Sequence, residues 1–192
     1  FANMTSVLST IRALQPNALL YANECRWSCG LHDDSCSVVE RWPSVPAELD
    51  LISFDMYTAG KFFTVPYGKC PIYLTDAVAE VHLVRAFYES TVYSKLLPHQ
   101  RVLLVPPVYA CSEFALPAQD DYVKRSIETY ANWGWEDDRV AGLNGWHFNT
   151  RTKRQEGPPC PCDQRIGADM LPESLQQLRA TGLAIKNNRS GF

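Results

Sequence analysis

The chain has 192 residues, of which 46% are hydrophobic and 20% are charged, and its formal net charge is -3. This composition can form a buried core and excludes general disorder. The scattered Lys and Arg residues give no electrostatic footprint for DNA or RNA. The longest apolar runs, such as residues 102–105, are too short to cross a bilayer.

The first part of the sequence predicts a helix, a strand, a loop and a second strand. Apolar residues at helical spacing predict a first helix that stops at Gln15 and Pro16. A short apolar strand is expected over 18–24, and a loop with three cysteines follows over 25–36. A short helix over 38–42 then leads to a second strand over 49–57. Residues 59–72 contain Gly and Pro and are expected to form a long loop excursion.

The second part continues the alternation. A long helix is expected over 76–97, stopped by Pro98, and a third strand follows over 101–109. A helix over 120–133 and a fourth strand over 139–149 come next. Residues 150–167 are polar and rich in Pro and Cys, which indicates a third loop excursion. The last helix is expected from Pro172 to Thr181, with Gly182 beyond its end.

Strands that alternate with helices predict an α/β protein. Such an order implies parallel strands joined by right-handed crossovers. The strands are nearly continuous in apolar residues, which is typical of a sheet buried on both faces. No internal repeat or linker is visible, so residues 1–192 are expected to form a single domain.

The cysteines indicate an oxidising compartment. The chain has seven cysteines without the paired spacing of a zinc finger, and its four histidines are dispersed. Disulfides are therefore favoured over metal binding, although metal binding by Cys160 and Cys162, or by the cysteines of 25–36, stays open. Sequons at Asn3 and Asn188 agree with a secreted, or lysosome-like, glycoprotein. An odd number of cysteines leaves at least one thiol free or paired with another chain, and no metal or other cofactor is expected.

The candidate chemistry lies where the predicted strands end. Ligands of parallel α/β folds bind at the carboxyl ends of the strands. The first strand ends in Asn23 and Glu24, and alternation groups Glu24 with Leu20 and Ala22 on a face predicted to point inward. In the second strand, a polar set is predicted to face the interior and an apolar set to face the helices. The polar set is Ser53, Asp55 and Tyr57, and the apolar set is Ile52, Phe54 and Met56.

These residue types suit the cleavage of a glycosidic bond. Such cleavage needs one carboxyl group to protonate the leaving oxygen and another to act as nucleophile or to activate water. Glu24 and Asp55 are the candidate catalytic pair. The candidate substrate-binding residues lie at the ends of the second, third and fourth strands: Tyr57, Tyr109, Asn144, Trp146 and His147. No nucleophile elbow and no Gly-rich phosphate loop compete with this interpretation.

Three short motifs resemble the C-terminal half of (β/α)8-barrel glycoside hydrolases. Asn23-Glu24 is similar to the Asn-Glu pair that ends the fourth strand in a large retaining clan of these enzymes, where the Glu is the acid/base. Residues 49–57 resemble the "D-x-I-S-x-D-x-Y" strand of many barrel hydrolases. Residues 142–146 resemble their eighth strand, which ends in a tryptophan that lines the sugar site. The resemblance covers roughly residues 5–183.

The resemblance implies a TIM barrel of which this chain supplies about the last four strands and helices. Because a full barrel needs about 250 residues, we expect the N-terminal half on a missing or cleaved segment, to which the odd cysteine could form a disulfide. The implied function is that of a secreted glycoside hydrolase with a poly- or oligosaccharide substrate.

The third strand departs from the clan's pattern. The clan carries its nucleophilic Glu at the end of the seventh strand, but residues 105–109 contain no carboxylate, and Glu113 lies too far along the chain. The alternative prediction is therefore a non-catalytic carbohydrate-binding or extracellular structural protein on the same scaffold.

Overall fold

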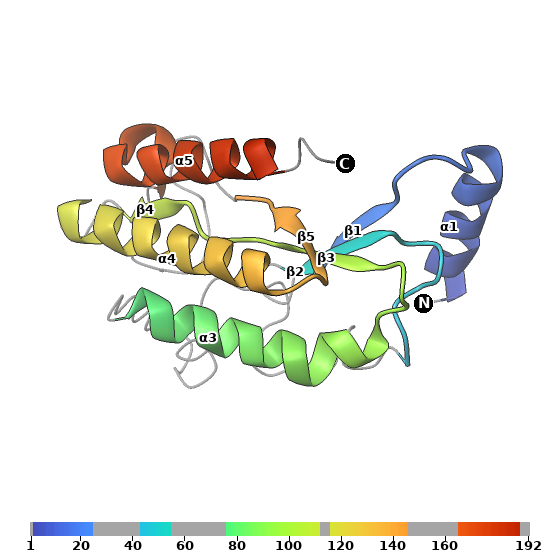
Figure 1. Ribbon diagram of the computed structural model, residues 1–192. Coiled ribbons are helices and arrows are strands. Elements are labelled where there is room, and N and C mark those ends of the chain that lie inside the picture. The colour runs from blue at the N-terminus through green and yellow to red at the C-terminus, as the bar shows by residue number, and fades with distance from the viewer. Residues whose placement is uncertain (1, 25–42, 55–75, 112–115, 146–164, 189–192) are drawn as a thin grey trace.

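A computed structural model describes residues 2–24, 43–54, 76–111, 116–145 and 165–188 (Figure 1). In chain order, its principal elements are α1 (Ala2–Leu14), β1 (Tyr21–Glu24), β2 (Leu51–Phe54), α3 (Ala77–Phe87), β3 (Arg101–Leu104), β4 (Tyr109–Cys111), α4 (Leu116–Glu136), β5 (Val140–Leu143), β6 (Arg165–Gly167) and α5 (Pro172–Asn188). The prediction of an α/β protein with a parallel sheet is thus confirmed.

The main sheet has four parallel strands in the order β1-β2-β3-β5. Neighbours in the sheet follow one another along the chain without a reversal. Each connection between these strands therefore extends the sheet in the same direction. A register shift between Val102 and Leu103 on β3 accommodates Ala141, which is an extra residue on β5.

Two helices cover one face of this sheet. Val81, Val84 and Tyr88 from the α3 segment share a buried cluster with Ile52 and Phe54 of β2. Val102 and Leu104 of β3, together with Tyr130 and Trp133 of α4, belong to the same cluster. Ile52 and Phe54 of the predicted apolar set therefore face the helices, as alternation predicted, and Met56 lies outside the described residues. Figure 1 shows α5 packed against α4 on the side away from α3, and α1 at the opposite end of the sheet beside β1.

The long helix predicted over 76–97 is present as a composite segment. Asp76 caps α3 by accepting hydrogen bonds from Val78 N and Ala79 N. The chain then passes through a π-helical turn, Tyr88–Val92, and a 3-10 turn, Tyr93–Lys95. The Tyr88 ring, fully buried at this transition, makes edge-to-face contacts with Phe54 and Trp133.

The third predicted strand is shorter than expected. β3 ends at Leu104, and Pro106 and Pro107 follow it. Because proline has no backbone N–H, the pair cannot continue a ladder of hydrogen bonds. The chain resumes as β4, which pairs antiparallel with β6 in a separate two-stranded sheet. Residues 165–167, predicted as part of a loop, form that partner strand.

The last helix is longer than expected. α5 runs through Gly182 to Asn188. Glycine weakens a helix interior by only about 1 kcal/mol, and the position of Gly182 is open on its outer side. The predicted loop over 25–36, helix over 38–42 and excursion over 59–72 lie outside the described residues. Within the described ranges, no helix is both long and apolar enough to cross a membrane.

Candidate functional site

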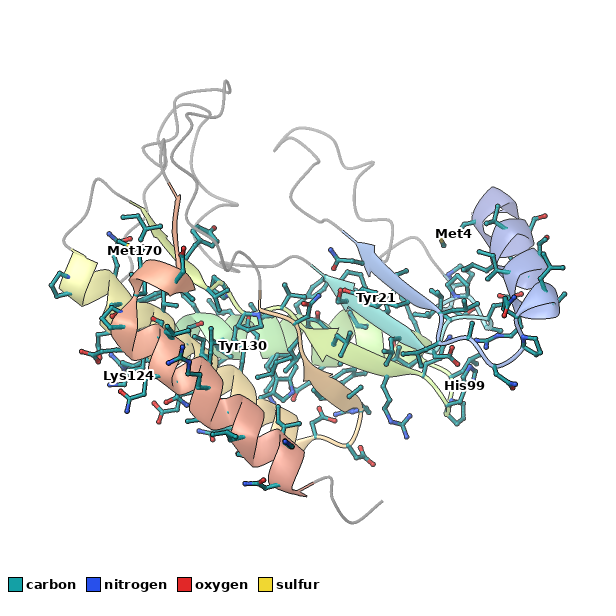
Figure 2. The ribbon with its side chains drawn as sticks, turned by 90° about the horizontal axis from the view of Figure 1, so that it is seen from above. Met4, Tyr21, His99, Lys124, Tyr130 and Met170 are labelled. Atoms are coloured by element: carbon teal, nitrogen blue, oxygen red, sulfur yellow. The ribbon has the colours of Figure 1, made fainter. Side chains whose placement is uncertain are left out.

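A polar row lies on the sheet face opposite α3 and α4. It is formed by Tyr21 and Asn23 of β1, Ser53 of β2 and Asn144, which directly follows β5. Leu20 and Ala22 pack with the helix-side core, so alternation along β1 places Tyr21 and Asn23 on the other face. Tyr21, which belongs to the β1 strand of the sheet, is labelled in Figure 2.

Hydrogen bonds connect this row from one edge of the sheet to the other. The Ser53 hydroxyl is fully buried and donates to Asn23 Oδ1. Tyr21 Oη lies 2.6 Å from Ser53 Oγ, and Asn144 Nδ2 lies 3.4 Å from Tyr21 Oη. A buried hydroxyl requires such partners, because an unsatisfied one is costly. The row is therefore a defined polar constellation near the carboxyl ends of three strands.

The structure corrects the face predicted for the first strand. Leu20 and Ala22 face the helices rather than the interior. The prediction that Glu24 points inward assumed that these two residues also point inward, and that assumption is wrong. Glu24 is the last residue of β1, and its backbone pairs in register with Phe54. The orientation of its side chain lies outside the description, and its catalytic role stays a prediction.

Of the other six predicted site residues, two lie within the described residues and four do not. Asn144 lies at the carboxyl end of β5, in the polar row. Tyr109 is partly buried and starts β4, where it pairs with Gly167, so it lies in the small sheet rather than at the end of β3. The remaining four lie outside the described residues: Asp55, Tyr57, Trp146 and His147.

Sequence reasoning missed Tyr21 and Ser53 as candidate site residues. The signal was present in β1, where polar Tyr21 and Asn23 alternate with apolar Leu20 and Ala22. Treating the apolar set as helix-facing in both strands would have put Asn23 beside Ser53. The two residues are indeed partners in the register.

The groups with large pKa shifts lie away from this row. Burial raises the pKa of Tyr122, helped by Glu80, which accepts the hydrogen bond of its hydroxyl. Burial also raises the pKa of Tyr88 and Tyr130 in the helix-side core. These phenols stay neutral at physiological pH and serve packing, so they mark no second site.

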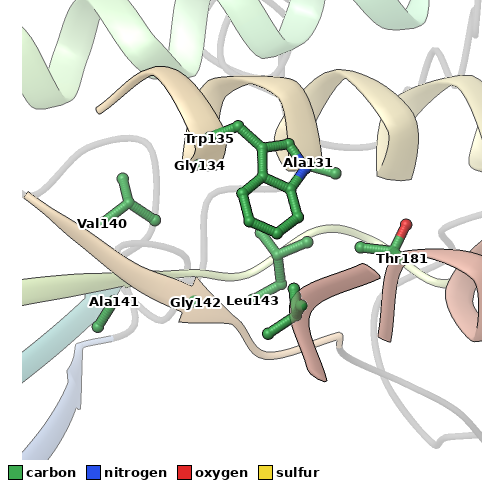
Figure 3. A pocket seen from close by; sticks show the side chains of 9 residues that line it. Ala131, Gly134, Trp135, Val140, Ala141, Gly142, Leu143 and Thr181 are labelled. Atoms are coloured by element: carbon green, nitrogen blue, oxygen red, sulfur yellow. The ribbon is translucent and has the colours of Figure 1, made fainter. Parts of the chain in front are cut away.

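An apolar pocket lies between β5, the end of α4 and α5 (Figure 3). The half-exposed indole of Trp135 forms one wall, and the lining also includes Ala131, Gly134, Val140, Ala141, Gly142, Leu143, Thr181 and Ile185. Its polar side chain is Thr181, which accepts a hydrogen bond from Gln177. Because this lining carries no ionisable group, the pocket offers no acid or base.

No metal centre is formed by the described residues, which hold no group of three or more His, Cys, Asp or Glu side chains placed to share an ion. Six of the seven cysteines lie outside the described ranges, so the disulfide prediction stays a prediction.

Comparison with protein-family models, with curated proteins and with solved structures finds no match. The fold and the polar row therefore define an α/β protein with a parallel sheet and a candidate ligand site at its strand ends.

Proposed function

We propose that this protein is a secreted glycoside hydrolase that acts on a poly- or oligosaccharide. The observation that carries the proposal is the polar row on the sheet face opposite α3 and α4, near the carboxyl ends of the strands. Parallel α/β folds bind ligands at this end. Hydroxyl and carboxamide groups suit the hydroxyl groups of sugars.

We propose further that the sheet is half of a (β/α)8 barrel. Its strands follow chain order without the reversal that marks a doubly wound sheet. The contact between Tyr21 of β1 and Asn144 after β5 joins two strands that a flat sheet would hold about 14 Å apart. That contact favours a sheet that curls toward the polar face, which is the sense of curvature that closes a barrel.

Exposed apolar side chains flank both edges of the sheet and support a barrel completed by further units. Val7, Ile11 and Leu14 of α1, with Leu19, are exposed on the β1 side. Trp135 and Leu183 are exposed on the β5 side. Four more β/α units, the N-terminal half of the same barrel on a separate or cleaved segment, would cover both flanks in the proposed protein.

Glu24 is the proposed acid/base, and Asp55 is the proposed nucleophile or second carboxyl. Replacing either by its amide, as Glu24→Gln or Asp55→Asn, is expected to lower the release of reducing sugar from a responsive glycan about a hundredfold or more. Glu128→Gln, on the exposed side of α4, is the control and is expected to keep full activity. Full activity in both site variants would rule out this assignment.

A non-catalytic carbohydrate-binding protein is the second candidate. The end of β3 favours it, because Leu104 is followed by buried Val105, Pro106 and Pro107 rather than by a carboxylate. A glycan array that shows binding, combined with no release of reducing sugar, would select this alternative. Release of reducing sugar would remove it.

A further inference from the structure

Asn144 occupies an exposed position at the carboxyl end of the edge strand β5. Its backbone N–H donates to Leu104 O at 2.8 Å, so its Cα is held by β3. Its side chain reaches back toward the sheet, where Nδ2 lies 3.4 Å from Tyr21 Oη. The backbone and the carboxamide of this residue are therefore positioned by different strands.

The hydrogen-bond chain has one consistent direction. The Ser53 hydroxyl has a single hydrogen, which goes to Asn23 Oδ1. At the 2.6 Å contact, Tyr21 must then donate to Ser53 Oγ. The Tyr21 oxygen in turn accepts from Asn144 Nδ2. The amide nitrogen of Asn144 is thereby turned toward Tyr21, and its Oδ1 remains as an acceptor at the exposed end of the strand.

Resting on the proposed function, we propose that Tyr21 and Ser53 are positioning residues that orient the Asn144 carboxamide, so that Asn144 Oδ1 accepts a hydrogen bond from a saccharide hydroxyl. Ser53 suits this role because it is fully buried and cannot reorient toward solvent. A carboxamide oriented in advance loses less conformational freedom when the ligand binds. Tyr21 thus acts on the ligand through Asn144.

The orienting chain can be tested without a ligand by NMR of the side-chain amide of Asn144. In the wild-type protein, the amide proton directed at Tyr21 Oη is expected to be protected from exchange with solvent, and Tyr21→Phe is expected to abolish this protection. Ser53→Ala is expected to weaken it, because Tyr21 then loses its acceptor. Tyr130→Phe, which removes a tyrosine hydroxyl from the core on the other sheet face, is the control. An Asn144 amide signal that Tyr21→Phe leaves unchanged would overturn the proposal.

The ligand role is tested by calorimetric binding of neutral β-1,4-linked hexasaccharides of glucose, xylose, mannose and N-acetylglucosamine. Tyr21→Phe is expected to weaken binding about three- to tenfold, the effect of one hydrogen bond. In an Asn144→Ala background, the same change is expected to have no further effect, because the two residues act in series.

The two outcomes that contradict the proposal are distinguishable. Binding that Tyr21→Phe weakens equally in the Asn144→Ala background would overturn the positioning role and leave the proposed function standing. No wild-type binding to any of the four hexasaccharides would overturn the proposed function and the saccharide role of Asn144. The exchange experiment would then still decide whether the orienting chain exists.

Discussion

Asp137 is a buried carboxylate in the turn between α4 and β5. Arg139 holds both of its oxygens, with Nε 2.8 Å from Oδ1 and Nη2 3.0 Å from Oδ2. The Arg139 guanidinium also lies 3.6 Å from the centre of the Tyr93 ring. Burial alone would raise the pKa of Asp137, but the hydrogen bonds outweigh it, chiefly those from Arg139, and lower the pKa to about 2 from 3.8.

This shift predicts an acid-sensitive contribution to stability. A carboxyl whose pKa is lowered in the folded state stabilises the fold at any pH above its pKa in the unfolded state. This stabilisation is lost as the pH falls from about 4 to 2. Asp137→Asn is expected to lower the free energy of unfolding at pH 7 by about 2 kcal/mol and to flatten its pH dependence in that window. Urea unfolding from pH 7 to pH 2 measures both effects. Asp138→Asn, at the exposed neighbouring position, is expected to change little, and equal effects in the two variants would contradict the prediction.

The α5 helix is capped by a residue of another helix. Asp120 of α4 accepts the backbone N–H groups of Glu173 and Ser174, at 3.0 and 2.8 Å. The first N–H groups of a helix have no partner within it, so this carboxylate satisfies two of them in a buried place. Its negative charge also complements the positive end of the helix dipole. One side chain therefore joins the start of α5 to α4.

Loss of this cap is expected to destabilise the protein more than an ordinary surface change. Asp120→Ala leaves the buried N–H of Ser174 and the part-buried N–H of Glu173 without this acceptor, and we expect a loss of about 1–3 kcal/mol. The shift of the urea midpoint measures it. Asp121→Ala is the matched control, because the neighbouring residue is exposed on the same helix. A loss below about 0.5 kcal/mol in Asp120→Ala would show that water replaces the carboxylate.

At the scale of the whole molecule, the odd number of cysteines makes a prediction that does not depend on the proposed activity. Three disulfides and one remaining thiol are expected in protein produced in an oxidising compartment. Alkylation of the denatured, unreduced protein should add one group, and reduction should raise this to seven. Intact mass spectrometry measures both values. Seven alkylated thiols before reduction would contradict an oxidised protein, and a tethered second chain would appear as extra mass that reductant removes.

Several elements were predictable because their signals are local. Asp76 and Pro98 bracket the α3 segment, and the alternation of apolar residues in β2 correctly gave its helix-facing side. The end of the third strand was predicted too late, although the proline pair marks it. β4 and β6 could not be foreseen, because each has only three residues and exists through pairing with a segment more than fifty residues away.

For the candidate site, alternation alone was insufficient. It sorts the residues of a strand into two faces but does not say which face the helices cover, and for β1 the wrong face was chosen.

The sequence by itself determined the α/β class, the order of the four main-sheet strands and of helices α1, α3, α4 and α5, and the concentration of polar residues at the strand ends. Periodicity, proline positions and residue type carry that information within short windows. Only the tertiary structure decided which side of β1 belongs to the core, and that Tyr21, Ser53 and Asn144 form one hydrogen-bonded chain. Their partnership depends on strand order, register and the course of the sheet, which bring together residues up to 123 positions apart.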